Sequence, residues 1–337
     1  MEDTGEIRRG NWAGRITGGD GLPGALRGGI VAIGNFDGVH RGHQAVLSLA
    51  LESAASKSVP ALVLTFEPHP RTVFGPGNPV FRLSPAPVRA RLLRNLGFSA
   101  VVEYPFDMEF AGRSAEAFVC DVLVGELGIS GAVTGVDFHF GKNRQGGPAF
   151  LMDAGQKHGF TVDLVDAFRD EGAEIVSSSR IRQSLRQGDV SEANGLLGYR
   201  YSIEGEVVRG KQLGRTLGYP TANFHLPEET GLCHGIYAVR LRRADGSLHD
   251  GVASFGRRPT IEDDGKAVLE VFVFDFTGDL YGEICTVSLF GYLRGEEKFD
   301  RVEALVEQMK RDDAEARALL SGVAPLSELD LAMAFAS

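Results

Sequence analysis

The period of the apolar residues changes near residue 200, and this change limits the folds open to the chain. Before it, short apolar runs alternate with longer segments of helical period. These segments occupy residues 29–33, 44–56, 61–66, 87–96, 100–104, 115–127, 132–135 and 150–158. Strands that alternate with helices predict a parallel sheet with crossover helices, so we expect a Rossmann-like α/β domain.

After the change, the apolar residues follow the period of β-strands. Short runs separated by turn residues occupy 201–208, 235–241, 251–255, 267–276 and 284–290, with a hairpin-like turn at 244–247. They predict a compact antiparallel β-barrel or sandwich. An amphipathic helix is expected over 299–320, packed against the barrel by its stripe of Val302, Leu305, Val306 and Met309.

The boundary between the two parts falls in a helical region. Residues 177–197 have the pattern of two short helices broken at Gly188 and Asp189. A length of 337 residues also favours two domains over one. We therefore predict a first domain over 1–187, a linker over 188–199 and a second domain over 200–337.

Charge and composition exclude several classes of protein. The formal net charge is -10, which argues against nucleic-acid binding through a broad basic surface. Apolar runs are too short to cross a bilayer, and the N-terminus lacks a signal-peptide pattern, so we expect a cytoplasmic protein without a membrane anchor. Cys120, Cys233 and Cys285 form no CxxC pair, which predicts buried thiols rather than disulfides or a cysteine zinc site.

Glycine is unusually frequent, with 44 residues in 337, nearly twice the average share of about 7%. One glycine-rich loop joins the apolar run at 29–33 to a helix, and it consists of Gly34, Asn35, Phe36, Asp37 and Gly38. His40 and His43 follow at the start of the helix. Their spacing places both imidazoles on one face, beside the free N–H groups and the positive end of the helix dipole. A triphosphate site is the favoured interpretation over two surface histidines or a zinc site, which has no third ligand nearby.

Three later segments also end apolar runs or begin helices with polar groups. His69 lies between two prolines in Phe-Glu-Pro-His-Pro, which directs its side chain or simply makes a rigid turn. Asp137 and Phe138 lie in a glycine-rich loop that suits a flavin ring or adenine, or is an ordinary loop. Ser178, Ser179 and Arg182 come from Ser-Ser-Ser-Arg-Ile-Arg, which suits a second anion site or a capped surface helix.

The segments GNFDGVHRGH, FEPHP, GVDFHFG and SSSRIR, in this order, resemble the N-terminal module of the prokaryotic bifunctional riboflavin kinase/FMN adenylyltransferase family, also called FAD synthetase. The HxGH part is similar to the nucleotidylyltransferase superfamily, although class I aminoacyl-tRNA synthetases use a similar motif. The resemblance implies that the FMN phosphate attacks the α-phosphate of ATP, giving FAD and pyrophosphate. His40 and His43 would stabilise the triphosphate and departing pyrophosphate, Arg182 would bind phosphate, and Asp137 would lie near the nucleotide and FMN.

The second part contains its own polar constellation. Gly210, Gly214 and Gly218 predict a mobile flap that wraps phosphates with backbone amides, without the ending of a Walker A loop. Thr221 and Asn223 are two residues apart, so an extended chain presents both on one face. On a strand of period two, Glu270 shares one face with Phe272, Phe274 and Phe276. Partial desolvation on this aromatic face would raise the pKa of Glu270 and suit a general base. The plain alternatives are a Pro-Thr turn and a solvent-exposed glutamate.

These residues also resemble the family, in its riboflavin kinase module. The resemblance implies a six-stranded barrel in which Glu270 accepts the proton of the ribityl 5′-hydroxyl, while Thr221 and Asn223 organise ATP and Mg²⁺, with Thr221 as the metal ligand. The segment Ser-Phe-Gly-Arg-Arg-Pro-Thr departs from the usual Asn-Ile-Gly-Thr-x-Pro-Thr at Ser254 and Arg257. These two substitutions put the affinity of the kinase site in question, but not its catalytic pair.

Three functions are compatible with these patterns. The favoured one is a two-step enzyme that makes FMN from riboflavin and ATP, and then FAD from FMN and ATP. The second keeps only adenylyl transfer with an inactive barrel, and the third makes the barrel a flavin-binding sensor. The Pro-Thr-Ala-Asn segment together with Glu270 argues against an inactive barrel. Glu270 also argues against a sensor, because flavin binding alone requires no general base. The sequence leaves the oligomeric state open.

Overall fold

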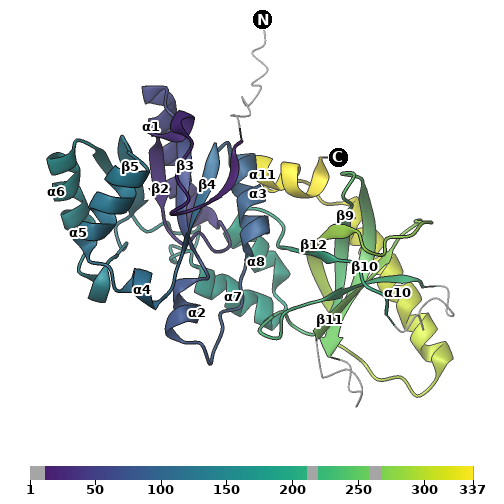
Figure 1. The fold of residues 1–337 in the computed structure, drawn as a ribbon. Coiled ribbons are helices and arrows are strands. Elements are labelled where there is room, and N and C mark those ends of the chain that lie inside the picture. The colour runs from purple at the N-terminus through teal and green to yellow at the C-terminus, as the bar shows by residue number, and fades with distance from the viewer. Residues whose placement is uncertain (1–11, 211–218, 258–266, 337) are drawn as a thin grey trace, which may run out of the picture. The chain divides into compact units, whose positions relative to one another are not determined.

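The computed structural model describes residues 12–210, 219–257 and 267–336. The chain divides into two compact units between Ser177 and Ser178 (Figure 1). The helical residues 178–197 thus group with the second unit, whereas the sequence pattern places the boundary at 188–199, which stays a prediction. Among the described helices, none is both long and apolar enough to span a membrane.

The first unit is built on a six-stranded parallel sheet, which confirms the predicted α/β class. Its strands are β1 (Gly14–Thr17), β2 (Ile30–Ile33), β3 (Ala61–Glu67), β4 (Ala100–Pro105), β5 (Gly131–Gly135) and β6 (Thr161–Val165). They lie in the order β1-β4-β3-β2-β5-β6, and every neighbouring pair is parallel. All four residues of β2 are buried, as expected of a parallel sheet that is covered on both faces.

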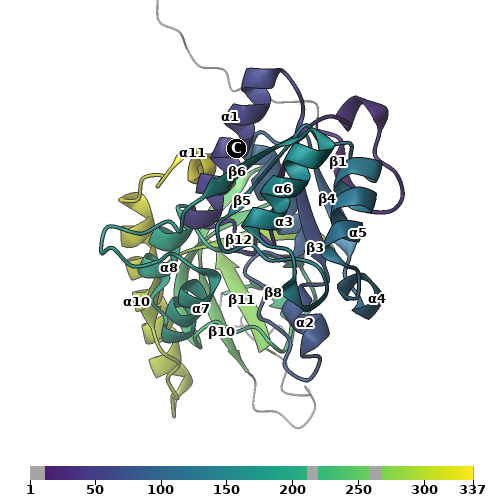
Figure 2. The same ribbon diagram turned by 90° about the vertical axis from the view of Figure 1, so that its left-hand side faces the viewer.

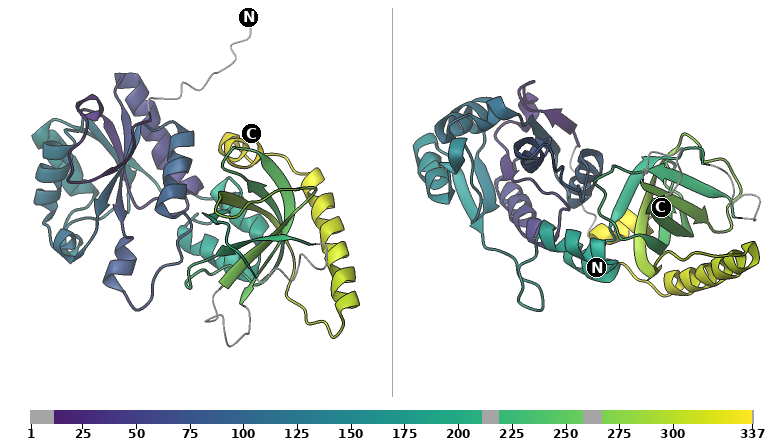
Figure 3. Two further views of the ribbon diagram at one scale, coloured as in Figure 1. Left: turned by 45° about the vertical axis from the view of Figure 1, so that its right-hand side comes forward. Right: turned by 90° about the horizontal axis from the view of Figure 1, so that it is seen from below.

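Helices lie on both sides of this sheet (Figure 3). They are α1 (Arg41–Lys57), α2 (Pro70–Phe74), α3 (Ala86–Leu96), α4 (Met108–Ala111), α5 (Ala115–Ala117) and α6 (Pro148–His158), with short 3-10 turns η1 (Gly24–Leu26) and η3 (Lys142–Arg144). The predicted helix over 115–127 is only partly α-helical: α5 passes directly into the π-helical segment η2 (Phe118–Glu126). The apolar residues of η2 and α6 pack on one face of the sheet, in a core cluster with Val31 and Leu64.

The second unit begins with two helices and continues as an antiparallel sheet. The helices are α7 (Ser178–Gln187) and α8 (Val190–Leu197), and α8 contacts β12 (Figure 2). The strands are β7 (Ser202–Glu206), β8 (Thr221–His225), β9 (Gly235–Arg242), β10 (Leu248–Arg257), β11 (Ala267–Val273) and β12 (Ile284–Arg294), in the order β7-β12-β9-β10-β11-β8. A bridge between Val208 and Asn223 brings the two ends together, so the predicted barrel is confirmed and nearly closed.

Helix α10 (Val302–Ser321) packs on the barrel as predicted, and Leu305, Val306 and Met309 of the predicted stripe are half-buried. Val302, in the predicted stripe, is 56% exposed, whereas Ala316 and Leu320 are buried in a cluster with Phe290. The buried Asp312 carboxylate forms a bidentate ion pair with the Arg294 guanidinium of β12, with N–O distances of 2.7–2.8 Å. Asp312, Ala316 and Leu320 continue the face of Leu305 and Met309 toward the end of the helix. The ion pair with Arg294 adds a polar contact that the apolar period does not report.

The chain ends with α11 (Glu328–Asp330) and the π-helical segment η4 (Leu331–Phe335), tied to the barrel by a buried ion pair. The Asp330 carboxylate is fully buried and accepts hydrogen bonds from the backbone N–H and the guanidinium of Arg200, both at 2.7 Å. It also accepts the Leu326 N–H at 2.9 Å. Arg200 therefore joins the start of the barrel to its last helices.

Removing Asp330 should destabilise the second unit strongly. The Asp330→Ala change leaves the buried Arg200 guanidinium without its carboxylate, so we expect the free energy of unfolding to fall by about 3–5 kcal/mol. Urea denaturation followed by circular dichroism measures this loss. The Glu307→Ala change, which removes an exposed ion pair with Lys310 on α10, should cost less than about 1 kcal/mol. Equal losses in the two variants would contradict the structural role of the buried pair.

Candidate active sites

Three of the predicted motifs meet at one edge of the first unit. Strand β2 lies between β3 and β5, so the strand order changes direction at β2, with β3 on one side of it and β5 on the other. The loops that follow β2, β3 and β5 contain His40, His69 and Asp137, and all three leave the carboxyl ends of neighbouring parallel strands. Ligands of open α/β sheets bind at such a switch point. The sheet order thus gathers motifs that lie far apart in the sequence.

The loop after β2 has an unusual backbone conformation. Phe36 and Val39 have positive φ angles of 49° and 39°, and Gly38 has 89°. Positive φ is strained for Phe and especially for the β-branched Val, and such strain persists where packing holds it. Both side chains are buried, and a Cβ at Gly34 would lie 3.0 Å from the Phe36 ring. The loop is therefore a tightly packed turn that directs the chain into α1.

His40 and His43 form a stacked pair at the start of α1. Their ring centroids are 3.6 Å apart with an interplanar angle of 16°, and the His40 Nδ1 caps the helix by accepting the His43 N–H at 3.2 Å. A Cβ at Gly42 would lie 3.2 Å from the His40 ring and 3.4 Å from the Val176 carbonyl oxygen. Glycine at this position therefore lets the pair form.

The electrostatics of the pair keep His43 uncharged at neutral pH. Burial, and next the charge of His40, lower the pKa of His43 well below 6.5. Its Nδ1 and the Asn35 Oδ1 are buried without a hydrogen-bond partner among the described residues. Buried polar atoms normally have partners, so these two atoms suit a polar ligand.

The second constellation lies on one face of neighbouring barrel strands. Glu270 of β11 pairs directly with Asn223 of β8, and Phe272 pairs with Thr221. On its other side, Glu270 pairs with Ser254 of β10. Directly opposite residues share a face, so a carboxylate, an amide and two hydroxyls lie together there.

This face is half-buried, whereas the alternate residues Leu269 and Val271 point into the barrel core. Tyr219 packs on Phe272 at 4.8 Å between ring centroids. The expectation that Phe274 and Phe276 extend the same strand face is wrong. Strand β11 ends at Val273, and Asp275 then turns the chain with a positive φ of 52°.

Asn223 is buried and is covered by the segment after β7. Its Nδ2 donates to the Thr221 carbonyl at 3.1 Å, and its Oδ1 has no partner among the residues that the structure describes. A Cβ at Gly210 would lie 2.7 Å from that Oδ1. Gly210 therefore allows the backbone to lie directly on the amide. Gly214 and Gly218, the other two glycines of the predicted flap, lie outside the described residues.

Comparisons with known proteins bear on both constellations. A family model described as FAD synthetase matches residues 23–180, and one described as riboflavin kinase matches residues 197–320. A bifunctional riboflavin kinase/FMN adenylyltransferase from Pseudomonas fluorescens is 42% identical over 87% of this chain and 93% of its own length. The chain belongs to the bifunctional riboflavin kinase/FMN adenylyltransferase family. The relative of that name from Escherichia coli strain K12 is 37% identical, over 86% of this chain and 91% of its own.

A solved structure from Streptococcus pneumoniae has the same fold over most of the chain. It is described as a macrolide-efflux protein and has a TM-score of 0.80 at 31% identity, covering 90% of this chain and 98% of its own. The family membership predicted from the motifs is thus confirmed by sequence, and the fold is shared with a solved structure of nearly the same extent.

In this family member, the remaining predicted residues of the first unit differ in their surroundings. Asp37 is buried, and its carboxylate accepts the N–H groups of Leu83 and Ser84 at 3.3 and 3.0 Å. These bonds hold the glycine-rich loop against the segment before α3. His69 is also buried, and its Nδ1 caps α2 by accepting the Arg71 N–H at 3.1 Å. Asp37 and His69 thus have structural partners, and ligand binding by them stays a prediction.

Asp137 and Phe138 lie in the loop after β5, which starts as a tight turn. Asp137 is exposed, and the half-buried Phe138 stacks on Phe140 with centroids 5.4 Å apart. Gly141 and Gly146 of this loop serve packing instead, since a Cβ would lie 2.6 Å from the Ala115 nitrogen and the Phe140 ring respectively. A ligand role for Asp137 and Phe138 therefore stays a prediction.

The first turn of α7 carries the predicted phosphate-binding residues. Ser179 is exposed, Ser178 is half-buried and Arg182 is buried. All three belong to the second unit. Phosphate binding by these three residues during adenylyl transfer stays a prediction. Arg180 pairs with Glu192 and so joins α7 to α8.

A buried charge network lies beneath the loop after β2, and the sequence motifs did not predict it. The fully buried Arg89 of α3 donates to Glu67 and Glu103 at 3.0 and 2.9 Å, and to the Asn35 carbonyl at 3.3 Å. Burial raises the pKa of Glu67, but Arg82 and Arg89 outweigh it, so the pKa is lowered overall. An arginine between two buried apolar residues, Val88 and Ala90, was the available signal.

The His40–His43 pair predicts a measurable pKa change. In the His40→Ala variant, we expect the pKa of His43 to rise toward 6.5, because the neighbouring charge is gone and the ring is less covered. An NMR titration of the His43 ring from about pH 4 to 8 measures the shift. An unchanged or lower pKa would contradict the coupling of the two rings.

Gly210 predicts a loss that is confined to the riboflavin kinase unit. The Cβ of a Gly210→Ala variant would displace the Asn223 amide, and a misplacement of about 1 Å costs on the order of 10²-fold in rate. We expect kcat/KM for FMN formation to fall by this order, while FAD formation from FMN is unchanged. Gly195→Ala on α8 is the control, since a Cβ there meets nothing within 4 Å. Equal kinase activity in the two variants would refute the packing argument.

Proposed function

We propose that the chain carries out two consecutive ATP-dependent reactions in separate units. In the barrel, the ribityl 5′-hydroxyl of riboflavin attacks the γ-phosphate of ATP, which forms FMN and ADP. In the α/β unit, the FMN phosphate attacks the α-phosphate of a second ATP, which forms FAD and pyrophosphate. The membership of the family and the match of each unit to one of its two models support this assignment.

For adenylyl transfer, we assign the triphosphate to the start of α1. The stacked His40–His43 pair, at the switch point of the sheet, carries this proposal. The neutral His43 ring and the loop amides donate hydrogen bonds to the phosphates, and the helix dipole favours the charge that develops on the departing pyrophosphate. Arg182 and the hydroxyls of Ser178 and Ser179 are proposed to bind phosphate, while Asp137 and Phe138 would lie near the flavin.

For phosphoryl transfer, the pairing of Glu270 with Asn223 across β11 and β8 carries the proposal. Glu270 accepts the proton of the attacking hydroxyl, since its carboxylate lies on the half-buried face beside Asn223 and Thr221. Mg²⁺ prefers oxygen ligands, and the Thr221 hydroxyl fits that preference, as does the Asn223 Oδ1, which has no partner within the part of the chain that the structure describes. When bound with ATP, the ion supplies charge neutralisation at the transferred phosphoryl group.

Incubating the purified chain with riboflavin, ATP and Mg²⁺, and separating the flavins by chromatography, tests both assignments. We expect FMN to appear first and FAD to follow. Accumulation of FMN without FAD would refute adenylyl transfer, and FAD from added FMN but never from riboflavin would refute the kinase. The cytoplasm is the compartment that we propose, because all three cysteines are free thiols, as a reducing compartment keeps them.

A further inference from the structure

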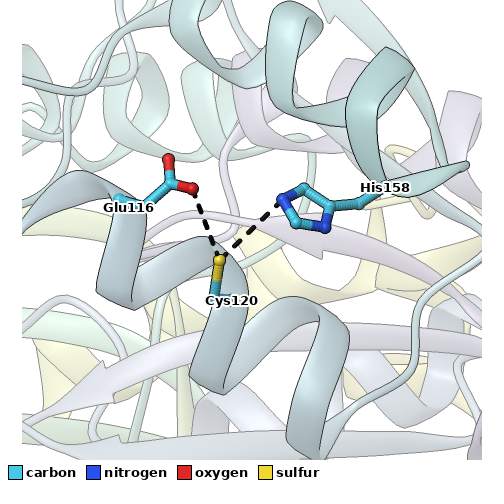
Figure 4. A group of neighbouring side chains, drawn as sticks. All are labelled: Glu116, Cys120 and His158. Atoms are coloured by element: carbon cyan, nitrogen blue, oxygen red, sulfur yellow. Dashed lines mark hydrogen bonds between the residues drawn. The ribbon is translucent and has the colours of Figure 1, made fainter.

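Three side chains with metal-ligating atoms meet on the helices of the first unit. They are Glu116 of α5, Cys120 of η2 and His158 of α6 (Figure 4). His158 ends α6 shortly before β6 begins, so it lies toward the edge where the strands start. The adenylyl-transfer loops leave the opposite edge, where the strands end. From this juxtaposition we propose that Glu116, Cys120 and His158 form a binding site for Zn²⁺ or a similar divalent ion such as Co²⁺.

The two distances from the Cys120 sulfur are close to the edges of a tetrahedral zinc site. The Cys120 Sγ lies 3.6 Å from the Glu116 Oε1 and 3.8 Å from the His158 Nε2, and all three ligand atoms lie within 4.8 Å of one another. Zinc–sulfur bonds of about 2.3 Å and zinc–nitrogen or zinc–oxygen bonds of about 2.1 Å, at tetrahedral angles, separate the ligand atoms by about 3.6 Å. An ion therefore fits with small movements of the side chains.

The local structure explains why these side chains converge. Glu116 and Cys120 are four residues apart on one continuous helical segment, so they share a face. His158 comes from the last turn of α6, which Gly159 ends with a positive φ of 81°. The ligands thus come from the continuous α5–η2 segment and from α6 of the same unit, and a bound ion would hold these helices together. A thiolate and a carboxylate also neutralise the two charges of the ion.

The same three groups are poorly arranged for a reactive thiol. In a nucleophilic cysteine–histidine pair, the acid orients the histidine, but here Glu116 contacts the cysteine. Metal binding is therefore the use that this arrangement favours.

The ligand set also selects the ion. One thiolate, one imidazole and one carboxylate suit Zn²⁺ or Co²⁺, while Mg²⁺ and Ca²⁺ prefer oxygen ligands alone. Water would complete the tetrahedron as the fourth ligand. Lys157 contacts the Glu116 Oε1 at 2.7 Å, and an incoming ion would replace this exposed ion pair. The site is thus distinct in chemistry from a site for Mg²⁺ with ATP.

Cobalt titration of the full, tag-free chain tests the proposal. The metal-free protein, without nucleotide, is titrated with Co²⁺ and then with Zn²⁺. We expect one Co²⁺ per chain with a thiolate-to-cobalt charge-transfer band in the near ultraviolet, displaced by Zn²⁺ but not by excess Mg²⁺. Cys120→Ser should abolish the band, while Cys233→Ser should leave it unchanged.

Two further variants keep the test decisive if one of them folds poorly. Glu116→Gln and His158→Gln should each weaken Zn²⁺ binding by at least about tenfold, since even partners outside the ligand set cost that much. Zn²⁺ should also protect Cys120, and neither other cysteine, from alkylation as read by mass spectrometry. A band that persists in Cys120→Ser, its loss in Cys233→Ser, or unprotected Cys120 at saturating Zn²⁺ would overturn the proposal. Binding at the His40–His43 pair would produce no thiolate band.

Discussion

Replacing Glu270 by glutamine is expected to reduce kcat for FMN formation by about 10²–10⁴-fold, the usual contribution of a general base. Glutamine keeps the size and polarity of the side chain but cannot accept the proton of the ribityl hydroxyl. Because Asn223 and Thr221 pair with the same strand and are unchanged, riboflavin and ATP should still bind. Initial rates of FMN formation, with separate measurements of the KM values, check this result.

Two controls separate catalysis from folding in this experiment. FAD formation from supplied FMN should be unaffected in Glu270→Gln, since that reaction belongs to the other unit. Glu206→Gln changes an exposed glutamate of β7 in the same barrel and should leave FMN formation near the wild-type rate. Parallel loss of both activities would mean that the two sites are not separable, and a raised KM with unchanged kcat would mean that Glu270 only binds substrate.

Replacing His43 by alanine is expected to lower kcat for FAD formation by about 10²–10³-fold, as for the loss of one preorganised donor to a developing charge. The FMN formed from riboflavin should then accumulate, because the barrel is unaltered. The pKa of His43 lies well below 6.5, so falling pH from about 8 to 6.5 leaves the ring neutral. The ratio of wild-type to variant rates should therefore be the same at both values.

A substitution elsewhere on α1 serves as the matched control for His43→Ala. Glu52 is exposed on the same helix, and Glu52→Gln should retain FAD formation. A rate ratio that collapses toward unity as the pH falls from about 8 to 6.5 would show that His43 titrates in this range, contrary to its burial beside His40. Full activity of His43→Ala would remove this residue from the proposed site.

Much of the fold could be predicted because local period reports which faces are buried. The alternation before residue 200 predicted the parallel sheet, and the short runs after it predicted the barrel. The period of the apolar residues did not predict strand β8, which is only five residues long and follows Pro220. It also missed the ion pair of Asp312 on α10 with Arg294, because this is a contact between residues of different elements.

The candidate sites show a similar division. Loop motifs depend on local backbone geometry, so the glycine-rich turn and the His40–His43 spacing could be recognised directly. The Arg89 network could not, because its acids come from β3 and β4 and are neighbours of α3 only in three dimensions. The three cysteines predicted as buried thiols differ as well: Cys285 is buried, but Cys120 and Cys233 are only half-buried.

By itself, the sequence determined the two classes of domain, the family and the types of residue that carry the chemistry, because these depend on local period and short motifs. Tertiary structure alone decided which of those residues are neighbours. The register of β8 and β11 sets Glu270 beside Asn223, and the packing of η2 and α6 sets Cys120 beside His158. Strand pairing and helix packing join residues far apart in the chain, and no local pattern records those distances.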